Sequence, residues 1–209
     1  MTSMNLRARL ATGLACAAFA SPFFVACRST MPPASQAPLA APPERDAAQA
    51  GTSARDALAH VLLVPTRNQT VEGVLVLERQ GERVHITGTV TGLTEGLHGF
   101  HIHETGDCSA PDATSAGGHF APEGHPHGSP DDPEQRHHSG DFGNIDADAQ
   151  GVARVDLWSS LPLLTIGPQY VVGRAFIVHA GKDDLRSQPS GDAGGRVACG
   201  VIRQGTPAR

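Results

Sequence analysis

The chain has 209 residues and a formal net charge of −5, with 16 Lys or Arg against 21 Asp or Glu. This length accommodates one domain of about 150 residues with a surplus, rather than two domains. From Arg55 onward, 12 basic residues stand against 19 acidic ones, so net charge excludes nucleic acid as a partner.

Residues 1–26 have the pattern of a signal peptide. Arg7 and Arg9 precede an apolar stretch at residues 10–25, which is short for a membrane span. The segment FVAC at residues 24–27 resembles the cleavage site of bacterial lipoproteins, in which lipid is attached to the cysteine. We therefore expect Cys27 to be a lipid anchor. The alternative is cleavage nearby, with Cys27 discarded or left as a free thiol.

Residues 27–54 are expected to form a linker. Seven Ala and five Pro lie within residues 31–50, which leaves little to bury. Because Pro-rich segments stay extended, this linker would hold a domain away from a membrane surface. Residues 55–209 are then the single folded domain.

That domain has the pattern of an all-β fold. Short apolar or alternating runs, separated by Gly, Asp, Asn and Pro, occur at residues 58–64, 71–77, 83–90, 97–103, 152–158, 170–178 and 197–202. Gly81 marks a hairpin between the second and third runs. No long stretch has helical periodicity, so the spacing predicts a sandwich or barrel. Residues 104–144 and 180–195 are expected to be long loops, which are usually functional.

Histidines gather at the fourth run and after it. His101 and His103 alternate with Phe100 and Ile102, so two imidazoles would share one face of a strand while the apolar side chains enter a core. Imidazole and carboxylate are ligands for copper and zinc. Two ligand choices are ambiguous among the histidines of this region, because His125 competes with His127 and His137 with His138.

Five segments in this order resemble the copper/zinc superoxide dismutase family. They are GFHIHE at residues 99–104, SAGGHF at 115–120, HSGD at 138–141, GRAFIVHA at 173–180 and GRVACG at 195–200. The resemblance covers roughly residues 57–203. It implies an eight-stranded Greek-key β-barrel, a flattened immunoglobulin-like sandwich for which this family is a known example, with a long metal-binding loop and an active-site loop.

The resemblance implies one copper and one zinc ion per subunit. The implied copper ligands are His101, His103, His119 and His179; the implied zinc ligands are His119, His127, His138 and Asp141. His119 would bridge the two ions as imidazolate. A spacing of eight residues from His119 favours His127, and the His-x-Gly-Asp pattern favours His138. The competing His125 and His137 are then expected to be solvent-exposed, and Gly140 is expected to allow the bend between ligands.

Other residues take expected roles from the same resemblance. Asp183, with Asp184 as the weaker candidate, would bridge His101 to His127. Arg196 would guide the substrate anion, and Cys108 would form a disulfide with Cys199. We expect His98 to be a structural histidine, and His60 and His85 to be ordinary surface or core residues.

The implied reaction is the disproportionation of superoxide to dioxygen and hydrogen peroxide. Copper would cycle between two oxidation states beside the imidazolate-bridged zinc, and His119 would deliver a proton to the developing peroxide. The expected location is the periplasm or cell envelope of a bacterium, where the enzyme would serve antioxidant defence. The membrane would be contacted only through the Cys27 anchor, and assembly as a homodimer is compatible with the family.

Two alternatives fit parts of the sequence. A zinc metallohydrolase of the metallo-β-lactamase type also carries His-x-His, but its signature needs Asp and His directly downstream, where this chain has Thr105 and Gly106. A periplasmic copper/zinc buffer or copper-delivery protein on the same fold would share the ligands. Storage needs no anion guide, so Arg196 disfavours it.

Overall fold

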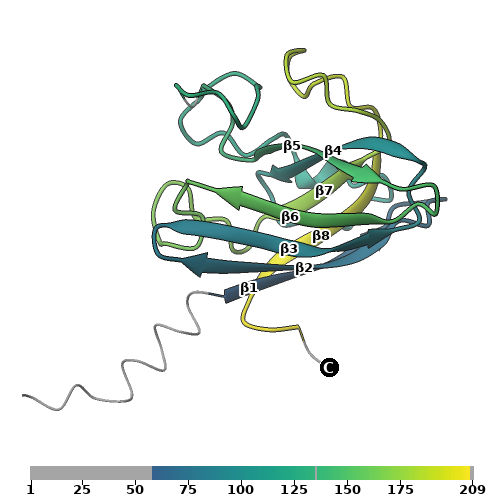
Figure 1. The fold of residues 1–209 in the computed structure, drawn as a ribbon, viewed down its shortest axis with the longest axis horizontal. Coiled ribbons are helices and arrows are strands. Elements are labelled where there is room, and N and C mark those ends of the chain that lie inside the picture. The colour runs from purple at the N-terminus through teal and green to yellow at the C-terminus, as the bar shows by residue number, and fades with distance from the viewer. Residues whose placement is uncertain (1–57, 135, 208–209) are drawn as a thin grey trace, which may run out of the picture. The chain divides into compact units, whose positions relative to one another are not determined.

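The computed structural model describes residues 58–134 and 136–207, which form a closed barrel of eight antiparallel strands (Figure 1). The strands are β1 Leu58–Pro65, β2 Glu72–Gln80, β3 Arg83–Thr91, β4 Gly96–His103, β5 Asp141–Ala147, β6 Ala153–Ser159, β7 Ala175–His179 and β8 Arg196–Gln204. Within these residues the one helical element is the 3₁₀ turn η1, Thr114–Ala116. The expected all-β barrel is confirmed, while the expected signal peptide, Cys27 and linker lie outside the described residues.

The strands do not pair in chain order. Around the barrel the order is β1-β2-β3-β6-β5-β4-β7-β8, so β3 pairs with β6 and β4 lies between β5 and β7. This crossover sets the histidine-bearing strand β4 between the strand that begins at Asp141 and the strand that ends at His179. Residues far apart in the sequence therefore meet on one side of the barrel.

Strand β4 divides its side chains as its alternation predicts. Phe100 and Ile102 are fully buried in the main hydrophobic core. The Phe100 ring centroid lies 4.7 Å from that of Phe176 on β7 and 6.3 Å from that of Phe142 on β5. His101 and His103 point out of the barrel, yet they too are buried because loops cover them.

The sequence pattern missed one strand and misplaced another. Strand β5 was missed: its first residues, 141–144, fall in the predicted loop 104–144, because Asp, Gly and Asn stand at the start of the strand and Gly143 has a φ of 68°. Such residues are depleted in strands. The seventh run was predicted from residue 170, but β7 begins at Ala175, after turns that include Gly173 at a φ of 91°.

The seam between β5 and β6 is thin. These strands share a single register pair, Ala147 with Ala153. Beyond it a cavity separates Phe142 of β5 from Trp158 of β6, and Pro130 and Leu185 from the two long loops border the same cavity. The loops thus border the least paired part of the barrel wall.

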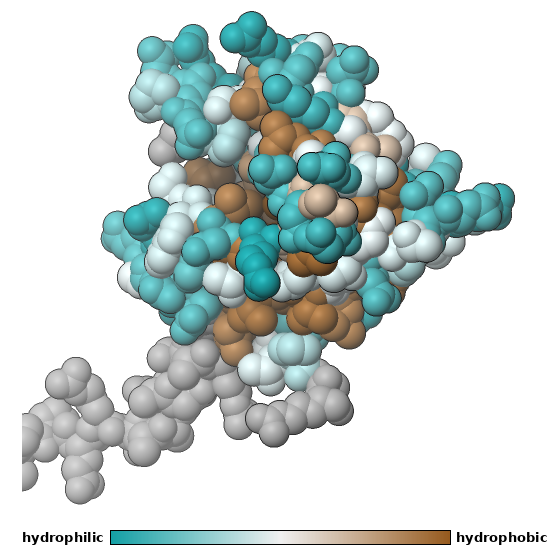
Figure 2. Space-filling model, turned by 45° about the vertical axis from the view of Figure 1, so that its right-hand side comes forward, coloured by the Kyte–Doolittle hydropathy of each residue, from teal (hydrophilic) through white to brown (hydrophobic). Residues whose placement is uncertain are grey.

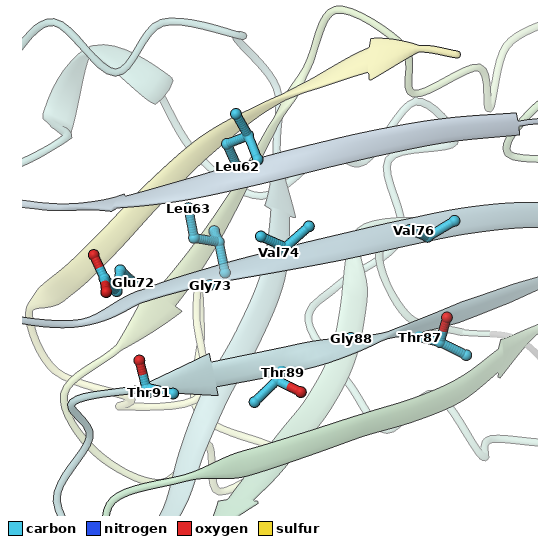
Figure 3. A pocket seen from close by; sticks show the side chains of 10 residues that line it. All are labelled: Leu62, Leu63, Glu72, Gly73, Val74, Val76, Thr87, Gly88, Thr89 and Thr91. Carbon is cyan, nitrogen blue, oxygen red and sulfur yellow. The ribbon is translucent and has the colours of Figure 1, made fainter. Parts of the chain in front are cut away.

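The outer face of β1, β2 and β3 is partly apolar. Leu62, Val64 and Val74 are each about half exposed, and a depression on this face is lined by residues of all three strands, among them Leu62, Val74 and Thr89 (Figure 3). Elsewhere hydrophobic patches also reach the surface between hydrophilic side chains (Figure 2). No residue lining the depression is a histidine, so it lies apart from the predicted ligands.

Over the part of the chain that the structure covers, no helix is long and apolar enough to cross a membrane.

Candidate metal centre

Two buried clusters contain every predicted ligand. The ligand atoms of each cluster lie within 4.8 Å of one another. The first cluster consists of His101, His103, His119 and His179, and the second of His119, His127, His138 and Asp141. In Figure 1 the two long loops rise on the same side of the barrel as β4 and β5, which carry His101 and Asp141.

The first long loop returns along the end of β4. His103 and His119 form an isolated antiparallel bridge. The Glu104 N–H donates to the Gly118 carbonyl at 2.9 Å, and the Phe120 N–H donates to the Ile102 carbonyl at 2.9 Å. These backbone bonds fix His119 beside His103, although sixteen positions separate them in the sequence.

The first cluster presents unpaired nitrogens. His101 Nε2 donates to Asp183 Oδ2 at 2.7 Å, His103 Nδ1 to the Gly117 carbonyl at 2.9 Å, and His179 Nδ1 to the Gly194 carbonyl at 3.1 Å. Because these acceptors carry no proton, the second ring nitrogen of each histidine keeps its lone pair. His101 Nδ1, His103 Nε2, His179 Nε2 and His119 Nε2 are all buried without a hydrogen-bond partner. Unpaired buried nitrogens are costly, and four that converge fit a copper ion.

The second cluster has the spacing of a tetrahedral site. Asp141 Oδ1 lies 2.8 Å from His119 Nδ1, 3.0 Å from His127 Nδ1 and 3.2 Å from His138 Nδ1. His138 Nδ1 lies 3.3 Å from His119 Nδ1. A tetrahedral zinc ion with ligands at about 2.0 Å would place those ligands roughly 3.3 Å apart. Three imidazoles and one carboxylate therefore fit zinc.

His119 is shared by the two clusters through opposite nitrogens. Its Nδ1 faces Asp141 in the second cluster, whereas its Nε2 is the unpaired atom assigned to the first. The ring also lies 4.1 Å, between centroids, from that of His101. This is the arrangement that a bridging imidazole requires.

Burial keeps three of these imidazoles neutral, which is the form that binds metals. Desolvation lowers the pKa of His103 to about 2, that of His179 to about 3 and that of His119 to about 4. At His127 burial also acts to lower the pKa, but hydrogen bonds with Asp141 and Asp183 outweigh it and raise the pKa to about 9.

Asp183 connects the two clusters. Its Oδ2 accepts from His101 Nε2 and its Oδ1 accepts from His127 Nε2 at 2.9 Å. Burial opposes ionisation of this carboxyl, but these two hydrogen bonds and one from the Leu185 N–H hold its pKa below the usual range. The carboxylate thus orients one histidine of each cluster, and Asp184 does not take this place.

Asn144 on β5 fixes Asp183, a contact that sequence reasoning missed. The Asp183 N–H donates to Asn144 Oδ1 at 2.8 Å, and Asn144 Nδ2 donates to the Asp183 carbonyl at 2.9 Å. The residue was read as the end of a loop, three positions after Asp141. Only recognition of β5 as a strand next to β4 could have placed it here.

Arg196 lies beside the first cluster. Its guanidinium donates from Nη1 to the Ala113 carbonyl and from Nη2 to the Gly117 carbonyl, both at 2.6 Å. Gly117 is also the acceptor for His103, so one carbonyl joins the arginine to a cluster histidine. Burial lowers the pKa of Arg196 from a usual value of 12.5, and Asp112 opposes this, so the side chain stays cationic.

A disulfide ties the first long loop to β8. Cys108 and Cys199 are bonded, with their Cα atoms 5.8 Å apart. Cys199 lies three residues after Arg196 on the same strand, and Cys108 starts the segment that carries Ala113 and Gly117. The predicted pairing is therefore present. It links β8, which carries Arg196, to the loop whose carbonyls accept from the arginine.

The prediction that both competing histidines are solvent-exposed was wrong for His137. His137 is buried, its Nδ1 donates to the carbonyl of His138 at 2.7 Å, and it belongs to neither cluster. His125 is exposed and also lies outside them.

Gly140 lies in the expected turn between His138 and Asp141, which the Asp141 N–H closes by donating to the His138 carbonyl at 3.0 Å, but glycine is needed there for another reason. Its backbone is not in the positive-φ region; instead, a Cβ atom would overlap the carbonyl oxygen of Ile102. Glycine is needed because the chain passes so close to β4 that the Ile102 N–H donates to the Gly140 carbonyl at 2.8 Å.

The remaining histidines have structural contacts. His98 Nδ1 donates to the carbonyl of His179 at 2.8 Å and its Nε2 faces the carbonyl of Thr94 at 2.9 Å. His60 contacts the Gly205 carbonyl, and His85 pairs with Asp156 and stacks on Trp158. None of the three belongs to a cluster.

Comparisons with known proteins point the same way as this geometry. The family model described as copper/zinc superoxide dismutase (SODC) matches residues 71–202. The extracellular superoxide dismutase (Cu-Zn) of Brugia pahangi is 38% identical over 151 residues, which cover 68% of this chain and 74% of that protein. A solved structure titled as a crystal structure analysis of the clock protein EA4 is 38% identical, with a TM-score of 0.64, covering 71% of this chain and 94% of that chain.

Replacing the bridging carboxylate is expected to weaken both clusters. Asp183→Asn leaves an amide that cannot accept from His101 and His127 together, so we expect copper and zinc affinities to fall about 10- to 100-fold. Competition with chelators would measure each affinity. Asp156→Asn, which alters an exposed pair with His85, is the matched control. Loss of affinity for one metal alone would contradict the bridging role.

Proposed function

The chain belongs to the copper/zinc superoxide dismutase family, and we propose that its two clusters hold the copper and zinc ions with which it disproportionates superoxide. The observation that carries this assignment is the convergence of four buried, unpaired histidine nitrogens beside a cationic arginine. His101, His103, His119 and His179 would hold copper; His119, His127, His138 and Asp141 would hold zinc. Bound copper would supply one-electron chemistry in both directions, and bound zinc would supply a fixed positive charge.

The side chains of the centre would bind the substrate and handle the protons. The Arg196 guanidinium would attract superoxide against the negative charge of the whole chain, since it stays cationic. The reaction consumes two superoxide ions and two protons. His119 Nε2 faces the first cluster, and we assign it the role of taking up a proton and delivering it to the reduced oxygen species.

The carbonyls of Ala113 and Gly117 fix where Arg196 can act. Each accepts one hydrogen bond from the guanidinium, which leaves other N–H groups of the five for an anion. The disulfide and the Thr66 hydroxyl, which donates to the Arg196 carbonyl at 2.8 Å, hold the backbone on which the arginine stands. The fold thus sets the position of the Arg196 guanidinium.

We place the enzyme outside the cytoplasm. The signal-like residues 1–26, the disulfide and the extracellular relative named above support this location. The finer proposal is a bacterial lipoprotein of the periplasm or cell envelope, in which residues 27–54 form the linker between a lipid on Cys27 and the domain at residues 55–209.

The first prediction from this function concerns metal-dependent turnover. Protein loaded with copper and zinc should consume two superoxide ions for each hydrogen peroxide formed. Chelation of copper should abolish the activity and added copper should restore it. Superoxide consumption and peroxide yield are the measurements. Tight binding of both ions without turnover would instead support the copper/zinc buffer.

Charge reversal at the arginine tests substrate guidance. Arg196→Glu should lower the second-order rate constant at low salt by about 10-fold or more, because a local attraction becomes a repulsion. Added salt should reduce the difference between the variant and the wild type. Arg203→Glu, an exposed position on the same strand, makes the same charge change and serves as the control. Equal rate constants for Arg196→Glu and Arg203→Glu would refute guidance by Arg196.

The anchor is tested on the mature protein from a bacterial host. Mass spectrometry should find an N-terminus at Cys27 that carries lipid, and Cys27→Ser should move the protein from the membrane fraction to the soluble fraction. A mature N-terminus beyond residue 27 would contradict the lipoprotein proposal.

A further inference from the structure

A short turn in the second long loop is held by its own hydrogen bonds. The Asp184 carboxylate accepts from the Arg186 N–H at 2.9 Å and from the Ser187 N–H at 2.8 Å. The Asp184 N–H donates to the Gly191 carbonyl at 2.8 Å, and the Gly191 N–H donates to the Ser187 carbonyl at 2.7 Å. Residues 184–191 therefore form a compact unit, which we call the 184–191 turn.

Gln188 projects from this turn onto the backbone of His127. The His127 N–H donates to Gln188 Oε1 at 2.9 Å, and Gln188 Nε2 donates to the His127 carbonyl at 2.8 Å. One amide group thus satisfies both polar backbone groups of a single residue, which otherwise would need two partners. The two residues lie 61 positions apart, on the two different loops.

Gly191 brings the turn against the side chain of the same histidine. A Cβ atom at this position would overlap the Asp183 carboxylate and lie 2.7 Å from His127 Nε2, and the φ of 70° also favours glycine. The side chains of His127 and Asp183 are both fully buried. The backbone of the turn therefore covers the hydrogen bond that orients His127.

We propose that Gln188 is a positioning residue for zinc, closing the 184–191 turn over His127 and slowing the release of the ion. This inference rests on the proposed function, because it takes His127 as a zinc ligand. Gln188 fixes the backbone of His127, whereas Asp183 and Asp141 lie against its two ring nitrogens. Without the amide, the loop backbone that carries His127 loses its hold on the 184–191 turn. None of the described contacts of Gln188 involves His101, His103 or His179, so we expect the effect to be larger for zinc than for copper.

The test uses the full chain loaded with copper and zinc. Gln188→Met keeps the length of the side chain but removes the donor and the acceptor. Zinc transfer to an excess of chromogenic chelator should be about 10-fold faster than in the wild type, while copper transfer should change less than twofold. Gln169→Met is the matched control: Gln169 also donates to the first long loop, at Glu123 Oε1, but on the exposed surface. It should release zinc at the wild-type rate.

A second measurement separates positioning from general stability. The melting temperature of the metal-free protein reports folding alone, and the increase caused by zinc reports the coupling of zinc to the fold. We expect Gln188→Met to reduce that increase, and Gln188→Ala to do the same.

Equal zinc release from the wild type and Gln188→Met, or an equal loss of melting temperature with and without zinc, would overturn the inference about Gln188. A wild-type protein that binds no zinc would overturn the proposed function instead.

Discussion

The metal centre depends on one buried carboxylate. Asp183 accepts a hydrogen bond from a histidine of each cluster, and through these bonds it decides which ring nitrogen of His101 and His127 remains free. Three strands and the first long loop contribute the remaining ligands, so no single segment could orient them. Asn144 and the Leu185 N–H in turn fix the carboxylate. Loss of this one group would leave both imidazoles free to rotate.

Much of this centre could be predicted from the sequence. The alternation around His101 and His103 required one face of a strand for the imidazoles, and the structure has them there. The choices of His127 over His125 and of His138 over His137 came from spacing within recognisable motifs, and the second cluster contains the chosen residues. Motifs predict these ligands well because two ligands of each ion lie in one short segment, whose spacing is set by the local backbone.

The parts that escaped prediction depend on contacts between distant segments. Strand β5 has a polar, glycine-containing start, so its pairing with β4 rather than its own pattern makes it a strand. His137 is buried, and it shares two cavities with Leu161, a residue 24 positions away in the sequence. The amide contacts of Asn144 and Gln188 join residues 39 and 61 positions apart. No local pattern marks an amide whose partner is the backbone of another loop.

The thin seam between β5 and β6 gives the metal-binding loops a second consequence. Unpaired backbone at a strand edge is a template on which another chain can add a strand, and most pairs in this barrel leave no such edge. At the seam, Pro130 and Leu185 stand over the gap instead of a neighbouring strand. Contacts that hold the two loops in place would therefore also keep this part of the barrel wall covered, where it has the fewest strand pairs to protect it from a neighbouring chain.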